Sequence, residues 1–141
     1  MVRTAYSGFA TILMLVFAKP SPAEAEISLI SAWQQCEPTK GCLKFAFLPN
    51  GHVIKQFPLD GSVVTAYGHY HIRGAVLKIG WHRFEPARVC DASANANDGP
   101  HKQCVSTGQE DIKGPFHFEG MNALLWTAPG TPPLHLVRIQ L

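Results

Sequence analysis

Residues 63–84 read VVTAYGHYHIRGAVLKIGWHRF, and apolar and polar side chains alternate on both sides of the central glycine. This pattern predicts a β-hairpin that turns at Arg73-Gly74. One face would be apolar and the other polar, as in an antiparallel sheet with one side on a core and one in water. In that register Ile72 faces Ala75, Tyr70 faces Leu77, Gly68 faces Ile79 and Ala66 faces Trp81, while the other face carries Tyr67, His69, His71, Arg73, Lys78 and His82.

Shorter segments with the same period of two lie on both sides of this hairpin. Asn50-Gly51 separates two of them and is a strong signal for a tight hairpin turn, because both central residues of such a turn need a positive φ. No run of ten or more residues has helical spacing free of Gly, Pro or β-branched interruptions. Six strands are therefore expected beside the hairpin, at 27–33, 43–47, 52–57, 116–119, 122–127 and 134–140.

The pattern stops between Pro86 and Pro115, where Asp, Asn, Ser, Gly, Gln and Lys predominate. The sequence predicts one long polar loop at 86–115, of the kind that often serves function in a small domain. Cys90 and Cys104 are expected to close it by a disulfide. Cys36 and Cys42 form the second expected pair by proximity, although four cysteines allow three pairings. The spacings do not match the paired C-x2-C pattern of a zinc site.

The first 25 residues have the three parts of a secretory signal peptide. A basic start at Arg3 precedes an apolar run of about ten residues, and the small-residue site Ala23-Glu24-Ala25 follows. A bilayer span needs about 20 apolar residues, so a membrane anchor is the weaker reading. We expect cleavage after Ala25 and a single exported domain at 26–141, periplasmic or secreted, with no stable membrane anchor.

Charge excludes two classes of partner. The chain has 12 Lys and Arg against 10 Asp and Glu. Loss of Arg3, Lys19 and Glu24 with the signal would leave ten against nine. The basic residues are scattered singly, so we expect neither nucleic acid nor an anionic membrane surface as a partner.

Eight antiparallel strands in so short a chain must avoid exposed sheet edges, and an up-and-down barrel does so. Trp33 and the runs 47–51 and 67–79 resemble bacterial lipocalin-like domains over about half of the exported part. The resemblance implies an eight-stranded barrel with room for side chains or one small ligand. It departs from the lipocalin Gly-x-Trp signature because Ser31 stands two residues before Trp33. The expected fold is thus all-β, a small antiparallel up-and-down barrel or meander with one long loop closed by a disulfide.

Histidines are frequent, with seven in the chain. His69 and His71 lie on one face of a strand, where an H-x-H pair can supply two metal ligands. In the expected register His82 lies about 13 Å from His69 and cannot join them. Only His52, His117 or His135 could complete a site. Exposed polar residues on the wet face of the sheet would give the same pattern.

The long loop also carries oxygen donors suited to calcium, but the EF-hand pattern fails because Ala94 occupies its first ligand position. A solvated loop with an Asn-Asp-Gly turn accounts for the same residues. The donors are Asp91, Asn95, Asn97, Asp98, Glu110 and Asp111.

No catalytic motif appears, neither G-x-S-x-G, H-E-x-x-H, G-x-x-x-x-G-K-[ST] nor G-x-G-x-x-G, so we expect no enzyme, no catalytic residues and no cofactor. The aromatic residues could line a ligand pocket or fill a closed barrel, and a short chain needs them for stability. The candidate ligand contacts are Trp33, Tyr70, Trp81 and Trp126.

These observations favour an exported, non-enzymatic binding module. Either an apolar small ligand enters the barrel, or the 86–115 loop docks on a protein partner. The alternatives are a periplasmic metal-binding protein that uses His69 and His71, and a structural envelope protein.

Overall fold

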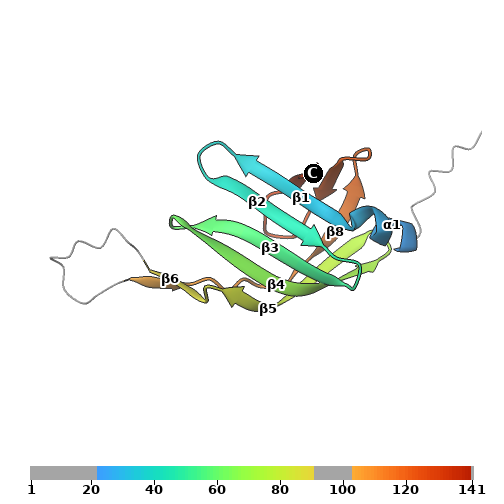
Figure 1. The fold of residues 1–141 in the computed structure, drawn as a ribbon. Helices are drawn as coiled ribbons and strands as arrows, with labels where there is room; N and C mark the ends of the chain where they lie inside the picture. The colour runs from blue at the N-terminus through green and yellow to red at the C-terminus, as the bar shows by residue number, and fades with distance from the viewer. Residues whose placement is uncertain (1–21, 91–102, 141) are drawn as a thin grey trace, which may run out of the picture.

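The computed structural model describes residues 22–90 and 103–140 (Figure 1). Eight strands form a closed antiparallel barrel in the order β1-β10-β9-β8-β5-β4-β3-β2, and β6 and β7 form a separate two-stranded sheet. The predicted all-β barrel is therefore confirmed. The elements are α1 (Pro22–Leu29), β1 (Ser31–Glu37), β2 (Gly41–Phe47), β3 (His52–Leu59), β4 (Ser62–Arg73), β5 (Val76–Glu85), β6 (Arg88–Cys90), β7 (Cys104–Ser106), β8 (Ile112–Phe118), β9 (Ala123–Trp126) and β10 (Leu134–Arg138).

The segment before β1 is helical, so the expected strand at 27–33 is wrong in its first half. Residues 22–29 read PAEAEISL, in which Ala, Glu and Leu favour helix. Ala25 and Leu29 are four residues apart and thus share one helix face, and both are buried. Figure 1 shows α1 at one end of the barrel. The predicted signal cleavage after Ala25 falls within α1, and residues 1–21 lie outside the described residues.

No helix in the described ranges 22–90 and 103–140 has the length and apolar content needed to span a membrane.

The central hairpin forms with the predicted faces, but the register is shifted by two residues. Ile72 pairs with Leu77 and Tyr70 with Ile79, because the turn lies at Gly74, which has φ +61°, and the following alanine. A shift of two keeps every side chain on its face. Tyr70, Leu77 and Ile79 point into the core as expected.

A β-bulge interrupts the same hairpin between Tyr67 and Gly68. Gly68 pairs with Trp81 and Tyr67 with Arg83, which leaves His82 as the extra residue on β5. A Cβ on Gly68 would collide with the backbone carbonyl of Gly80 and lie 2.9 Å from the Trp81 ring. Glycine therefore permits the close approach of the two strands at the bulge.

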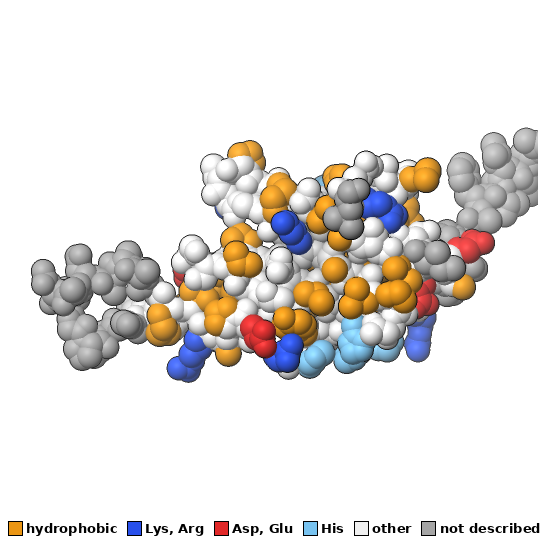
Figure 2. Space-filling view, in the orientation of Figure 1, with side chains coloured by type: hydrophobic (Ala, Val, Ile, Leu, Met, Phe, Trp, Pro, Cys, Tyr) orange, Lys and Arg blue, Asp and Glu red, His pale blue; other side chains and the backbone are white. Residues whose placement is uncertain are grey.

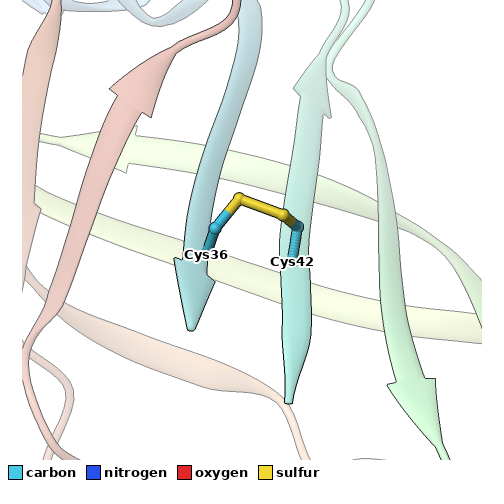
Figure 3. Close-up of a disulfide and its surroundings, with 2 residues drawn as sticks. All are labelled: Cys36 and Cys42. Atoms are coloured by element: carbon cyan, nitrogen blue, oxygen red, sulfur yellow. A yellow bond between two sulfur atoms is a disulfide. The ribbon is translucent and has the colours of Figure 1, made fainter. Parts of the chain in front are cut away.

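The expected loop at 86–115 is partly ordered into strands. β6 and β7 pair antiparallel with Cys90 opposite Cys104, and β8 already begins at Ile112. Both predicted disulfides, Cys36–Cys42 and Cys90–Cys104, are present. Figure 3 shows the first of these joining β1 to β2, near the end of one strand and the start of the next.

The core fills the end of the barrel next to α1. The largest fully buried side chains there come from five of the eight barrel strands, so this end is packed and not hollow. They are Trp33, Phe45, Phe47, Leu77, Ile79, Leu124, Trp126 and Leu136.

Substitution of a buried glycine tests how closely β8 approaches the end of β9. A Cβ on Gly114 would collide with the carbonyl oxygen of Thr127 and lie 2.8 Å from its carbonyl carbon. Because backbone cannot move aside cheaply, we expect Gly114→Ala to lower the free energy of unfolding by about 1–3 kcal/mol in urea denaturation. Gly108→Ala is the matched control, since its Cβ would meet only Ser106 Oγ at 3.5 Å. Equal stability of the two variants would contradict this packing.

Candidate ligand-binding site

A pocket of about 920 Å³ opens at the end of the barrel opposite α1. We call this end the barrel mouth; its walls are the β1–β2 turn, the last residues of β3, and the segments 109–113 and 128–134. β5 and β8 pair only from Val76 to Ile79, so the sheet separates beyond that point. Ligand pockets in proteins commonly measure about 300–1,000 Å³, and the barrel mouth falls within that range.

The lining of the barrel mouth mixes apolar and polar side chains. Leu43, Phe57, Ile112 and Leu134 supply apolar surface from four different strands. Several charged side chains also reach the pocket, with both signs equally represented. The acidic ones are Glu37, Glu110 and Asp111, and the basic ones are Lys40, Lys55 and Lys113.

Lys55 is the one lysine of the described residues that is buried, with an exposed fraction of 7%. β3 places it inside the barrel because Val53, Lys55 and Phe57 alternate inward along the strand. Its Nζ lies 5.0 Å from the ring centroid of Phe57 and 5.6 Å from those of Phe45 and Trp81. The ammonium thus lies among three aromatic rings.

Burial determines the protonation behaviour of this amine. Desolvation lowers the pKa of Lys55 from 10.5 to about 8, because removal from water disfavours the charged form. The rings compensate in part, since a cation near an aromatic ring gains about 0.5–2 kcal/mol.

Gln109 provides the hydrogen-bond acceptor for Lys55, whose Nζ donates to Oε1 at 2.6 Å. Gln109 follows Thr107, which is buried and is held by two contacts to the segment after β5. The Thr107 N–H donates to the carbonyl oxygen of Ala87, and its Oγ1 donates to that of Pro86. This anchoring places the Gln109 side chain at the barrel mouth.

Trp81 completes the surroundings of Lys55. Its backbone N–H donates to Asp111 Oδ1 at 3.1 Å. Its indole Nε1 is buried and has no hydrogen-bond acceptor among the described residues. A buried donor without an acceptor costs about 1–3 kcal/mol of stability. The surroundings of Lys55 therefore contain one unused donor, the indole N–H of Trp81.

The other predicted ligand contacts lie elsewhere. Trp33, Tyr70 and Trp126 are buried in the packed end of the barrel, and none of them lines the pocket. Each of these three donates its polar hydrogen to a backbone carbonyl, of Leu29, Leu48 and Gly114 respectively. Trp81 contacts Lys55 but is not among the residues that line the pocket either. Burial and the nearby Glu26 carboxylate raise the pKa of Tyr70, which keeps its phenol protonated as a donor.

Four histidines, His52, His69, His71 and His82, lie on the outer surface of β3, β4 and β5, where they form a patch (Figure 2). The ring centroids of His52 and His69 are 4.4 Å apart, and those of His69 and His82 are 5.1 Å apart. The predicted separation of His82 from His69 is therefore wrong, because the register shift and the bulge bring them together. His71 lies two residues beyond His69, opposite Lys78.

These rings do not form a metal centre as they stand. Across residues 22–90 and 103–140, no group of three or more His, Cys, Asp or Glu side chains is arranged to hold a metal ion. His117 and His135 lie on either side of Leu125, on β8 and β10, and His117 Nε2 is 3.6 Å from Glu119 Oε1. The histidine patch has the features of a polar outer sheet face.

Only two of the six candidate calcium donors, Glu110 and Asp111, lie in the part of the chain that the structure describes. Asp91, Asn95, Asn97 and Asp98 lie outside the described residues. Asp111 uses its carboxylate to accept from Trp81, and Glu110 lines the barrel mouth.

No protein-family model matches the chain, and no curated protein matches it. The class of the protein is accordingly given by its architecture, a closed eight-stranded antiparallel barrel with a pocket at one end.

Sequence analysis missed Lys55, although a signal for it exists. Residues 53–57 read VIKQF, so a strand that buries Val53 and Phe57 must also turn Lys55 inward. Ile54, on the outward face of the strand, obscures this signal, because with it both faces of the strand look partly apolar.

The lowered pKa of Lys55 makes a prediction about stability and pH. The folded protein releases this proton near pH 8, whereas the unfolded chain holds it until about pH 10.5, so the unfolded state binds more protons between these values. Stability therefore rises with pH in that window. Relative to Lys55→Met, the wild type should gain about 2 kcal/mol of unfolding free energy between pH 7.5 and 9.5.

Urea denaturation at several pH values measures this difference. Lys44→Met, which removes an exposed lysine from the neighbouring strand β2, is the matched control. If the difference in unfolding free energy between wild type and Lys55→Met stayed constant from pH 7.5 to 9.5, the burial of the Lys55 amine without a counter-ion would be contradicted.

Proposed function

We propose that this chain is an exported, non-enzymatic binding module that takes a small, mainly apolar ligand into the barrel mouth. The pocket of about 920 Å³ is the observation that carries the proposal. Its size suits a small molecule, and its apolar side chains converge from β2, β3, β8 and β10. A few polar groups at its inner end would orient the ligand.

The packing of the rest of the barrel supports this proposal. The end next to α1 is filled by aromatic and aliphatic side chains, so it provides a rigid scaffold. A rigid scaffold keeps a pocket preformed, which lowers the entropic cost of binding. The barrel topology also suits the lipocalin-like class, whose members enclose ligands in this way.

Export is part of the proposal and has separate support. Disulfides persist in oxidising compartments such as the bacterial periplasm. All cysteines of the described residues are paired, as Cys36–Cys42 and Cys90–Cys104. The signal-like pattern at the start of the chain points to the same compartments.

A variant that fills the pocket tests this function. Leu43 lines the barrel mouth from β2 and is only partly buried. Leu43→Trp adds bulk to the pocket, so we expect the affinity for the neutral fluorescent probe N-phenyl-1-naphthylamine to fall about tenfold or more, which is about 1.4 kcal/mol. Fluorescence titration of the purified protein measures this affinity.

Val137→Trp is the matched control, because Val137 is 54% exposed on β10 and does not line the pocket. Leu134→Trp repeats the test from another wall if Leu43→Trp fails to fold. Failure of the wild type to bind the probe, or equal binding by the pocket variants, would overturn the proposal.

A further inference from the structure

We propose that the ligand of the barrel mouth carries a carboxylate, which displaces the Gln109 amide oxygen from Lys55 and forms an ion pair with Lys55 Nζ. This inference rests on the proposed function and names the chemical class of the ligand. Three observations support it: a buried cation without a counter-ion, hydrogen-bond donors that exceed the acceptors, and an acceptor that can move away.

The first observation concerns charge. Residues 22–90 and 103–140 form ion pairs at Lys40–Glu37 and Arg83–Glu85, and His117 lies beside Glu119, but none of these contacts involves Lys55. An ammonium removed from water costs several kcal/mol unless an opposite charge accompanies it. Methionine or leucine at this inward position would avoid that cost. A lysine at this position, among three aromatic rings, points to an anion that arrives with the ligand.

The second observation concerns donors. An ammonium has three hydrogens to donate, and Gln109 Oε1 accepts one of them. The indole Nε1 of Trp81 is a further buried donor without an acceptor in the described part of the chain. Lys55 Nζ lies 5.6 Å from the centroid of the Trp81 ring. A carboxylate has two oxygens that only accept, so it would match the unused donors around Lys55.

The third observation concerns Gln109. Its oxygen already occupies a position 2.6 Å from Lys55 Nζ, where an oxygen of the ligand would bind. Gln109 is exposed, so its side chain can turn into water and keep its hydrogen bonds there. A neutral amide is also a weaker acceptor for an ammonium than a carboxylate, since charge-assisted hydrogen bonds are about twice as strong.

The remaining charges at the barrel mouth allow a monoanion. Apart from Lys55, three acidic and two basic side chains line the pocket, so a second negative charge on the ligand would be unfavourable. Glu37 lies 3.8 Å from Lys40, and Asp111 accepts from the Trp81 backbone. One carboxylate neutralises the one buried ammonium, whereas a phosphate dianion would bring an uncompensated charge into an apolar pocket. The site therefore suits a carboxylic acid with an apolar body.

Competition between an acid and its ester tests the assignment. Dodecanoate and methyl dodecanoate, both below micellar concentrations, displace N-phenyl-1-naphthylamine from the wild type at pH 7. We expect the acid to bind at least about tenfold more tightly than the ester. In Lys55→Met this ratio should fall to about one, because the ammonium is gone, and in the control Lys44→Met it should stay as in the wild type. Gln109→Ala should keep the ratio or raise it.

Equal affinity of the wild type for acid and ester, while the neutral probe still binds, would overturn the carboxylate assignment and leave the proposed function intact. Failure of the wild type to bind the probe at all would instead remove the proposed function.

A calorimetric measurement on the wild type keeps the test independent of folding of Lys55→Met. An ion pair with a carboxylate stabilises the protonated amine, so dodecanoate binding at pH 8.5 should take up a fraction of a proton, seen as a dependence of the binding enthalpy on buffer ionisation. No proton uptake would contradict the ion pair.

Discussion

Pairing of the first barrel strand with the last closes the sheet, and the pocket depends on that closure. The pairing is short, with Trp33 opposite Arg138, Gln34 opposite Val137, and a further hydrogen bond from Ile139 N to Ala32 O. Trp33 lies where the two strands meet, is fully buried, and donates from Nε1 to Leu29 O at the end of α1. The guanidinium of Arg138 lies 4.4 Å from the Trp33 ring centroid and donates to Ser28 O. Trp33 thus links β1 and β10 to the helix α1, which covers this end of the barrel.

Closure leaves two ends with different contents. The helix end is filled by large apolar side chains, whose burial supplies the main stabilisation of so small a domain. The mouth end has fewer such side chains and contains Lys55, which costs stability. The stabilising apolar contacts and the pocket therefore lie at opposite ends of the barrel. The aromatic rings of Phe45, Phe57 and Trp81 lie between the two ends, since they belong to or pack against the core clusters and also surround the amine of Lys55.

The fold could be predicted from local patterns, whereas the site could not. Seven of the eight barrel strands and both disulfides follow from alternation, turn residues and cysteine spacing, whereas the first strand was placed too early in the chain. The hairpin register was wrong by two residues because Gly74 can occupy more than one position in a turn. The bulge beside Gly68 depends on contact between two backbones, which no periodicity records, so His82 was placed far from His69. Lys55 was overlooked because Ile54 masks the parity of β3, and Gln109 meets it only through a contact 54 residues away along the chain.

The anchoring of Thr107 has a consequence for how the chain can change in evolution. Its two hydrogen bonds to Pro86 and Ala87 lie between the β6–β7 sheet and Gln109. The Cys90–Cys104 disulfide adds a second tie at the far end of that sheet. The Cys90–Cys104 disulfide and the hydrogen bonds of Thr107 therefore both lie between the pocket and any insertion or deletion between the two cysteines. Changes of length in this segment should therefore leave the backbone at Gln109, and with it this wall of the pocket, in place.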